Sequence, residues 1–223
     1  MRRSGESCGS ERSRVPLSLV KIAACAIILS IDGSEDLKIE KPFYELIPTA
    51  FGRMGIVWWK AAAGPRVRQV FLSRGRKPAK RAVLEEYPAA RRLASPGIVR
   101  LGGRIQRFFD GESVVFDLEM IALEVCGEFQ RRVLLAEHGI PRGWVSTYGR
   151  IARHIGSPGS SRAVGQALAT NPFPIIIPCH RAVRADGEMG GYQGGSEMKR
   201  ALLAMEGVEF TGRGTVLMQR VYY

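Results

Sequence analysis

The sequence predicts a mixed α/β (α+β) fold, in which a small α/β domain at residues 46–122 precedes a mainly helical domain at residues 123–210. Short runs of β-branched and aromatic residues around a Gly-Pro turn lie in the first of these parts. The second part contains helix-length segments separated by Gly and Pro. With 223 residues, of which 45% are hydrophobic, the chain is long enough to bury the core of one large domain or two small ones.

The first domain is expected to contain a hairpin, two helices and a third strand. The hairpin follows from two runs of strand-forming residues on either side of Gly64 and Pro65, which favour a turn. Each helix is expected to end where Gly, Pro or Asp-Gly interrupts the helical pattern. The strands are expected at residues 55–60, 67–72 and 114–118, and the helices at residues 78–93 and 98–109.

The second domain is expected to begin with three helices. Residues 129–138 place apolar side chains on one face, and Gly139 ends this helix. Ser146 or Thr147 can cap a helix that runs to His154, and a third helix is expected from residue 160 or 161 to about residue 170. Because a Gly and Pro turn joins the last two, we predict a helix-turn-helix that presents residues 161–169 to DNA.

Both ends of the chain differ from these domains. Residues 1–45 combine early arginines with an apolar run, as a secretory signal does, but the uninterrupted apolar part at residues 22–31 is too short to span a membrane as a helix. We interpret this segment as an unstructured extension or as a start assigned too far upstream, with a true targeting signal as the third alternative. Residues 211–223 are expected to form a strand-like or disordered tail without a role.

The chain is strongly basic, with a formal charge of +12 and a pI near 10.1. This charge favours an anionic partner, because Lys and Arg gain affinity for a polyphosphate when condensed counterions are released. The excess of Lys and Arg over Asp and Glu is marked between Arg66 and Arg107. We expect this segment to face phosphates. A well-solvated basic surface explains the same charge, and Lys199 and Arg200 are expected to be solvated.

The cysteine pattern argues against two classes of protein. It shows no CxxC pairing and no metal-ligand spacing with a histidine, so we expect neither a disulfide framework nor a metal or other cofactor. The chain is expected to be a reduced, cytoplasmic protein in which Cys126 only packs. The four cysteines are Cys8, Cys25, Cys126 and Cys179.

Cys179 is the candidate nucleophile. Pro178 cannot donate a ladder hydrogen bond, so the strand-like apolar run at residues 174–177 must break before the thiol. His180 can act as a base, through a water because adjacent side chains point different ways, and Arg181 adds positive charge that favours the thiolate. A buried cysteine that only packs is the alternative interpretation.

Seven sequence blocks occur in the order and spacing of one protein family. They are FQRRVL (129–134), IPRG (140–143), TYGRIA (147–152), SRAVGQAL (161–168), NPFPIIIPCHR (171–181), GGYQGG (190–195) and LLAMEG (202–207). The fifth block includes the PCHR sequence around the candidate nucleophile. Through these blocks the chain resembles, between residues 129 and 207, the O6-alkylguanine-DNA alkyltransferases, which transfer an alkyl group from damaged guanine to their own cysteine.

The resemblance implies a helical alkyltransferase domain with a single-turnover reaction. It implies that Cys179 attacks the alkyl carbon on guanine O6, while His180, oriented by Glu206, polarises a water that lowers the proton affinity of the thiol. Tyr148 is implied to donate its phenol proton to the leaving guanine, and Asn171 to hold the active-site loop against the recognition helix. Since water does not cleave a thioether, each molecule acts once. Without the resemblance, packing explains Tyr148 and turn formation explains Asn171.

The resemblance also implies docking in the DNA minor groove. Arg162 is implied to fill the space left when the damaged nucleotide flips out, because an O6 substituent inside the duplex cannot meet an in-line thiolate. The partner is double-stranded DNA with O6-alkylguanine, or O4-alkylthymine as a second lesion, and the protein is expected to act as a monomer away from membranes. The other implied DNA contacts are Ser161, Ala163, Gly165 and Tyr148, and the implied pocket residues are Tyr192, Gln193, Gly194 and Ala182.

Three other functions remain as alternatives. A non-catalytic binder of alkylated DNA would share the blocks but lack the cysteine, and a transcriptional regulator would need an effector or dimer module that the sequence does not show. A Cys-His hydrolase would need an oxyanion hole and a base distant in sequence. Arg150 and Gln193 depart from the family pattern, and either could change DNA affinity or substrate size.

Overall fold

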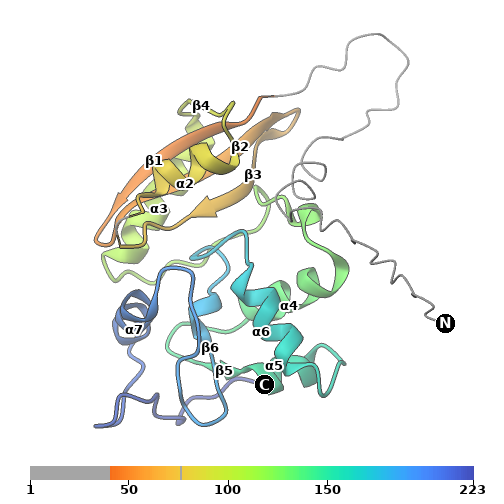
Figure 1. The fold of residues 1–223 in the computed structure, drawn as a ribbon, viewed down its shortest axis with the longest axis vertical. Helices are drawn as coiled ribbons and strands as arrows, with labels where there is room; N and C mark the ends of the chain where they lie inside the picture. Colours follow the sequence, from red (N-terminus) through yellow and green to blue (C-terminus); the bar gives the residue numbers. More distant parts are fainter. Residues whose placement is uncertain (1–40, 76) are drawn as a thin grey trace, which may run out of the picture. The chain divides into compact units, whose positions relative to one another are not determined.

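The structure, a computed structural model, describes residues 41–75 and 77–223, all of which belong to the compact unit Glu40–Tyr223 (Figure 1). It has a mixed α/β fold. Strand β1 (Phe43–Thr49) begins inside the segment expected to be an extension, so the predicted boundary at residue 46 was a few residues late. The remaining predictions for residues 1–40 lie outside the described residues. No helix in the described ranges has the length and hydropathy needed to cross a membrane.

The first part of the chain forms a four-stranded sheet in the order β3-β2-β1-β4. The predicted hairpin is confirmed as β2 (Gly52–Ala61) and β3 (Gly64–Phe71), which pair in antiparallel register. Its turn requires glycine at residue 64, where φ is 119°, a left-handed conformation that L side chains rarely adopt. Strand β1 pairs with β2 on the other side, and the two-residue β4 (Arg91–Arg92) runs parallel to β1.

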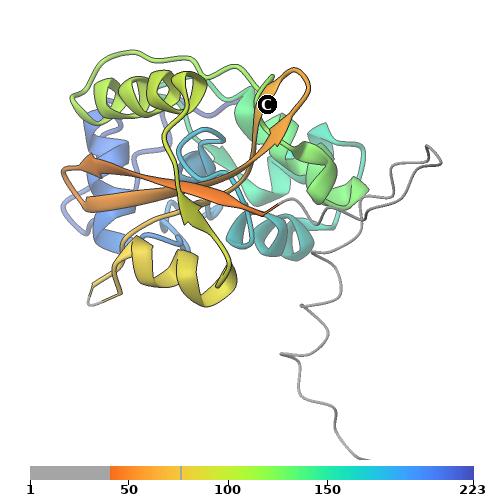
Figure 2. The ribbon, with the colours of Figure 1, turned by 90° about the horizontal axis from the view of Figure 1, so that it is seen from above.

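Helices cover both faces of this sheet. Figure 2 shows α2 (Ala79–Glu86) and α3 (Pro96–Phe109) on opposite sides. Successive residues of a strand point to opposite faces, so Ile56 and Trp58 pack in the cluster that includes α3, whereas Val57 and Trp59 pack with Val83 of α2. Burial on both faces explains why the centre of β2 reads as an uninterrupted apolar run rather than an alternating one.

Two predictions for this part of the chain were wrong. The helix expected at residues 78–93 ends at Glu86, because Tyr87 leaves the helical region at φ −126° and precedes Pro88, which disfavours the α conformation before it. The strand expected at residues 114–118 is irregular. Phe116 instead packs against Phe108, and its carbonyl oxygen lies 2.7 Å from His138 Nε2.

Most of the regular secondary structure in the second part of the chain is helical. Thr147 caps its second helix by accepting a hydrogen bond from the Arg150 backbone NH at 3.2 Å. A parallel pair of two-residue strands, β5 (Ser146–Thr147) and β6 (Ala182–Val183), connects this cap to the segment after the candidate nucleophile. The helices are α4 (Glu128–His138), α5 (Tyr148–His154), α6 (Ser161–Ala169) and α7 (Ser196–Met205), with short 3-10 helices η1 (Leu123–Val125) and η2 (Cys179–Arg181).

The carboxyl-terminal tail is packed, so the interpretation of residues 211–223 as disordered was wrong. Isolated bridges join Val145 to Val221 and Phe210 to Val216, which is the strand-like character that the sequence indicated. The Tyr223 ring stacks on His154 with ring centroids 3.6 Å apart, and Arg150 donates a hydrogen bond to the Tyr223 carbonyl. Arg150, one of the two departures from the family pattern, therefore anchors the end of the chain.

One apolar core connects the sheet to the helical part. The same cluster of buried side chains includes Trp58 of β2, Ile105 of α3 and Ile176 beside the candidate nucleophile. The Val70 backbone NH also donates a hydrogen bond to the Pro172 carbonyl at 2.7 Å. The boundary between residues 122 and 123 stays a prediction, since this core continues across it.

Candidate active site

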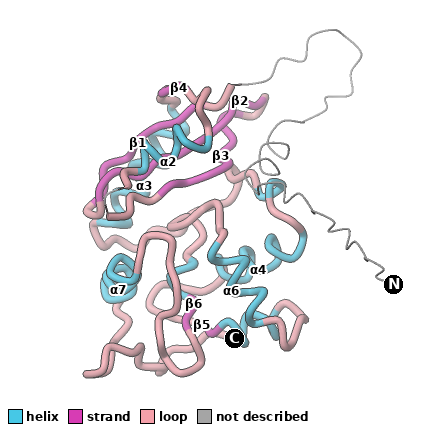
Figure 3. The backbone as a smooth tube through the Cα atoms, viewed as in Figure 1, coloured by secondary structure: helices cyan, strands magenta, loops and turns pink. Residues whose placement is uncertain are grey.

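Cys179 follows a tight turn rather than the strand that the apolar run suggested. Most of the chain between α6 and α7 is loop (Figure 3), and Ile175 has a φ of 75°, an uncommon conformation for a β-branched residue. Pro178, with φ −80° and ψ 57°, forms an inverse γ-turn in which the Cys179 NH donates to the Ile177 carbonyl at 2.8 Å. The turn directs the chain into η2, which starts with Cys179.

The side chain of Asn171 holds this turn together. Asn171 is 1% exposed, and its Nδ2 donates to the Ile177 carbonyl at 3.0 Å while its Oδ1 accepts from the Phe173 NH at 2.9 Å. Its own NH bonds to the Leu168 carbonyl of α6, and its carbonyl accepts from Gln193 Nε2 at 2.7 Å. Asn171 thus connects the cysteine turn, the predicted recognition helix and the glycine-rich loop.

His180 and Arg181 share one buried carboxylate, that of Glu206. Oε1 lies 3.0 Å from His180 Nε2, and Arg181 donates to the same carboxylate from Nε at 2.8 Å and from Nη2 at 2.7 Å. Burial alone would raise the pKa of Glu206, but His180 and Arg181 outweigh it and bring the pKa to about 2. Glu206 is therefore ionised and can only accept hydrogen bonds.

The ionised Glu206 fixes the tautomer of His180. Burial lowers the pKa of this fully buried imidazole, despite the opposing effect of Glu206. A neutral ring that donates from Nε2 leaves Nδ1 as a lone-pair acceptor, and Nδ1 has no hydrogen-bond partner within the described ranges. The site therefore holds a buried base with one free nitrogen.

The resting cysteine is a thiol. Cys179 is 5% exposed, and burial raises its pKa to about 12, although a hydrogen bond from Asn171 and the charge of Lys199 act in the opposite direction. Arg181 does not supply the predicted activation, because its guanidinium binds Glu206 and the Ile140 carbonyl. The thiol must therefore lose its proton during the reaction rather than before it.

Two tyrosines, Tyr148 and Tyr192, have a pKa raised by burial and by an electrostatic interaction with Cys179. Burial raises the pKa of Tyr148 to about 12, so this phenol is protonated and available as a donor. A Cβ added to Gly190 would come within 2.6 Å of Tyr148 Oη, so the glycine-rich loop can lie this close only with glycine there. The buried Tyr192 hydroxyl has no hydrogen-bond partner among the described residues, and its ring meets His180 edge-on at 6.2 Å.

The remaining pocket predictions have mixed outcomes. Ala182 is fully buried, and its carbonyl accepts from Lys199 Nζ at 2.6 Å, so it lies within the packed interior. Gly194 packs tightly, since an added Cβ would lie 2.2 Å from Met198 Sδ. Gln193 directs its side chain back to Asn171. The loop is therefore held against Asn171 through Gln193 and against α7 through Gly194.

The predicted helix-turn-helix is present as α5, a turn and α6. Gly156 and Gly159 occupy left-handed positions in the turn, with φ values of 68° and 85°. The exposed residues of α6 are Arg162, Ala163, Gln166 and Ala169, and the buried ones are Val164, Ala167 and Leu168. Ser161 is half-buried at the first position of α6, and Gly165 faces the Tyr148 ring, at 3.9 Å from an added Cβ.

Sequence reasoning missed two buried charged residues in this region. Lys199, expected to be solvated, is fully buried, and Glu137 on α4 is fully buried as well. Both signals were present in the apolar periodicity, because Lys199 precedes Leu202 and Leu203 by three and four residues, and Glu137 follows Val133 and Leu134 at the same spacings. A charge within an apolar stripe indicates a buried charge.

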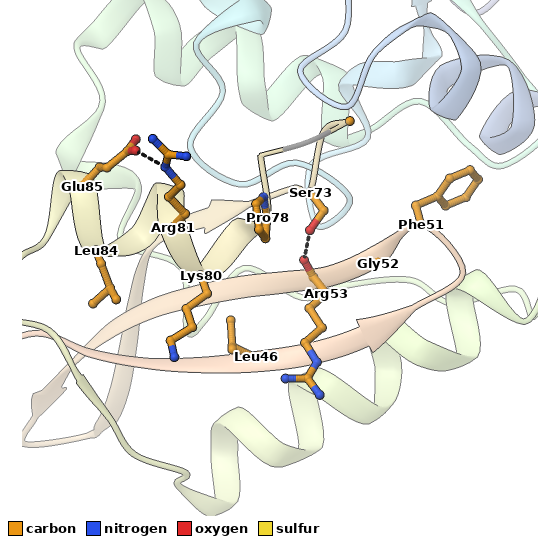
Figure 4. Close-up of a pocket in the computed structure, with 11 residues that line it drawn as sticks. Leu46, Phe51, Gly52, Arg53, Ser73, Pro78, Lys80, Arg81, Leu84 and Glu85 are labelled. Atoms are coloured by element: carbon orange, nitrogen blue, oxygen red, sulfur yellow. Dashed lines mark hydrogen bonds and ion pairs between the residues drawn. The ribbon is translucent and has the colours of Figure 1, made fainter.

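A separate groove lies on the sheet part of the molecule. It has a volume of about 850 Å³ between β1, β2 and α2, with Leu46 and Phe51 among its apolar residues and Lys80 and Arg81 on the helix (Figure 4). Ser73 Oγ donates to the Arg53 carbonyl at 2.6 Å beside it. None of the predicted site residues lines this groove, so it is distinct from the cysteine site.

Comparisons with known proteins show similarity to one family. Residues 128–208 match the profile of a family described as 6-O-methylguanine DNA methyltransferase, DNA binding domain. The structure resembles the crystal structure of Mycobacterium tuberculosis OGT in complex with DNA, with a TM-score of 0.58 and 33% identity over 74% of this chain and 92% of that one. The chain belongs to the O6-methylguanine-DNA methyltransferase family.

Two further members of this methyltransferase family show the extent of the similarity. The M. tuberculosis O6-methylguanine methyltransferase structure gives a TM-score of 0.59 at 32% identity, over 74% of this chain and 92% of that one. The methylated-DNA–protein-cysteine methyltransferase of Methanothermobacter thermautotrophicus is 48% identical over 116 residues, which are 52% of this chain and 65% of that methyltransferase. The match therefore spans slightly less than two thirds of that relative.

Proposed function

We propose that the chain repairs O6-alkylguanine in double-stranded DNA by transferring the alkyl group to its own Cys179, with O4-alkylthymine as a second lesion. The observation that carries this proposal is the neighbourhood of Cys179. A buried thiol precedes His180, whose Nδ1 has no hydrogen-bond partner among the described residues and whose Nε2 is held by an ionised carboxylate. Family membership supports the same reaction, because relatives are named for methyl transfer to a protein cysteine.

The transfer requires a proton acceptor and a proton donor. His180 Nδ1 takes the thiol proton through a water, and Glu206 stabilises the imidazolium that forms. The sulfur then attacks the alkyl carbon, the C–S bond forms, and the C–O6 bond breaks with its electrons moving to the guanine. Tyr148 donates its proton to the base, so that guanine leaves without a full negative charge.

DNA binding is assigned to the exposed face of α6. Its small side chains allow the helix to approach a groove closely, and Arg162, which is exposed and forms no ion pair within the described residues, fills the place of the flipped nucleotide. Ser161, Ala163 and Gly165 border it, while Tyr192 and the backbone of Gln193 form the wall of the guanine pocket. The protein acts as a cytoplasmic monomer, with the helical domain at residues 123–210 as its catalytic part.

The proposal is tested by incubating the protein with a duplex that contains one O6-methylguanine and measuring the intact-protein mass. We expect one added methylene mass per molecule and no further turnover, since a thioether is a poor leaving group. Cys179→Ser should bind the duplex without gaining mass. Cys126→Ser removes the second buried free cysteine of the described residues and is the matched control, which should gain mass as the wild type does. Transfer by Cys179→Ser would refute the assignment.

A further inference from the structure

Glu137 is a buried carboxyl group without a side-chain hydrogen-bond partner among the described residues. It lies on α4 and is 0% exposed, and the hydrogen-bonding group that acts on its carboxylate is the Ala182 backbone. Buried polar groups are satisfied in the great majority of cases, and an unpaired buried carboxylate is costly unless it holds a proton. The position therefore requires a physical explanation beyond packing.

The groups that act on Glu137 come from four other segments. Lys199 on α7 and Arg181 on η2 are the cations, and Cys179 on η2 and Tyr148 on α5 are the acids that the proposed reaction uses. Tyr223 of the carboxyl-terminal tail is the fifth group. Glu137 thus interacts electrostatically with both the nucleophile and the proton donor.

The two cations differ in what they bind. Arg181 is neutralised by two hydrogen bonds to Glu206. Lys199 Nζ donates only to backbone carbonyls, those of Ala182 and Met189 among them, and forms no ion pair within the described ranges. Burial lowers the pKa of Lys199 to about 8, so below this pH its positive charge is available to a neighbouring anion, which is either the Cys179 thiolate or the Glu137 carboxylate.

We infer that Glu137 controls the acidity of Cys179: protonated, it leaves the Lys199 charge to stabilise the thiolate, and ionised, it cancels that charge. The inference rests on the proposed function, in which Cys179 must lose a proton. Glu137 is then a positioning residue, because it acts through its charge on Cys179 and does not touch the substrate. The ionised form also weakens Tyr148 as a proton donor, so one charge opposes both proton transfers.

The transition falls close to neutral pH. Burial raises the pKa of Glu137 to about 8, although Lys199 and Arg181 act in the opposite direction. The ionised carboxylate in turn raises the pKa of Cys179. As pH rises through this range, more hydroxide favours the thiolate while Glu137 opposes it, so the reactivity of Cys179 should rise less steeply than that of an isolated thiol.

The test compares the wild type with Glu137→Gln, which removes the charge at nearly constant shape. Iodoacetamide, quantified at Cys179 by peptide mapping, reports the thiolate, and free O6-benzylguanine reports alkyl transfer. Glu128→Gln, at the exposed start of the same helix, is the matched control. The variant-to-wild-type rate ratio should be near one at about pH 6 and rise to about threefold to tenfold at about pH 9, while the control ratio stays near one.

Two results would overturn the inference. A Glu137→Gln ratio that does not change with pH would make Glu137 a packing residue, and a variant that is slower at every pH would make it a base. Glu137→Met tests the same charge if the Gln variant does not fold. If neither protein reacts with O6-benzylguanine while the iodoacetamide ratio rises, the repair function fails and the control of Cys179 acidity stands.

Discussion

The two parts of the described chain treat polar side chains differently. Among the described residues, the buried charged and hydrogen-bonding side chains other than Tyr and Trp all lie between residues 137 and 206. The described residues between 41 and 136 bury apolar groups, and each of their ion pairs, such as that of Arg81 with Glu85, has at least one exposed partner. Buried ions cost free energy that their attraction only partly recovers. The helical part therefore gives up stability to hold a reactive site, whereas the sheet part does not.

Loss of Glu206 should have the largest effect. Glu206→Gln leaves Arg181 buried without its counter-charge, which we expect to cost about 3–5 kcal/mol in the free energy of unfolding and to abolish transfer. Because the pKa of Glu206 is lowered from 4.5 to about 2, this stabilisation is complete above about pH 4.5 and is lost as pH falls through 2. Urea unfolding at several pH values measures it, and a neutral-pH loss below about 1 kcal/mol would contradict the buried network.

Glu137→Gln should raise the free energy of unfolding near neutral pH, whereas Glu206→Gln should lower it. Since burial raises the pKa of Glu137 from 4.5 to about 8, folding must take up a proton or bury a charge between those values, and wild-type stability falls as pH rises through that window. The variant avoids this loss, so its advantage over the wild type should grow by on the order of 3–4 kcal/mol from about pH 5 to about pH 8. Thermal unfolding across pH measures the difference, and a constant difference would contradict the prediction.

Arg162→Ala should change the reaction without changing stability, because the side chain is exposed. Repair of O6-methylguanine in a duplex should slow about tenfold or more, since only this substrate requires nucleotide flipping. The rate with free O6-benzylguanine should stay the same. Single-turnover rates with both substrates test the difference, and equal slowing of the two would count against a role in base extrusion.

The smallest effect is expected in the sheet part. Glu85 is exposed and pairs with Lys77 and Arg81, which together lower its pKa. Glu85→Gln should leave the urea midpoint and the transfer rate unchanged, because solvent screens surface ion pairs. It is the counterpart of Glu206→Gln, because each carboxylate contacts two basic side chains, Lys77 and Arg81 at Glu85 and His180 and Arg181 at Glu206. A similar destabilisation of both variants would remove the contrast between the two parts.

Sequence patterns predicted the elements that depend on residues close together in the chain. The hairpin at Gly64 and the capped helix after Thr147 follow from turn and cap chemistry within a few residues. The two-residue β4 could not be predicted in this way, because its pairing joins Arg91 to Phe43 of β1, which is distant in the sequence. The strand-like interpretation of residues 174–177 was wrong for another reason. A short apolar segment fits a strand and a buried turn equally well.

The residues of the candidate site could be predicted where a sequence motif marks them. They could not be predicted where their partners depend on how the chain buries them. The PCHR block led to Cys179 and His180, and the structure places Glu206 against His180. The actual partner of Arg181 was hidden, because nothing in the sequence shows that its guanidinium binds Glu206 rather than acting on the thiol. Lys199 was misjudged for the same reason, since backbone carbonyls that fold around it satisfy its charge.

The most direct test of the central claim is to follow an isotopically labelled methyl group from O6-methylguanine duplex DNA into peptides of the protein. The account predicts that the label appears in the peptide that contains Cys179, at no more than one methyl per molecule, and that the duplex regains unmodified guanine. Label on another residue, or repaired DNA with an unlabelled Cys179 peptide, would contradict it.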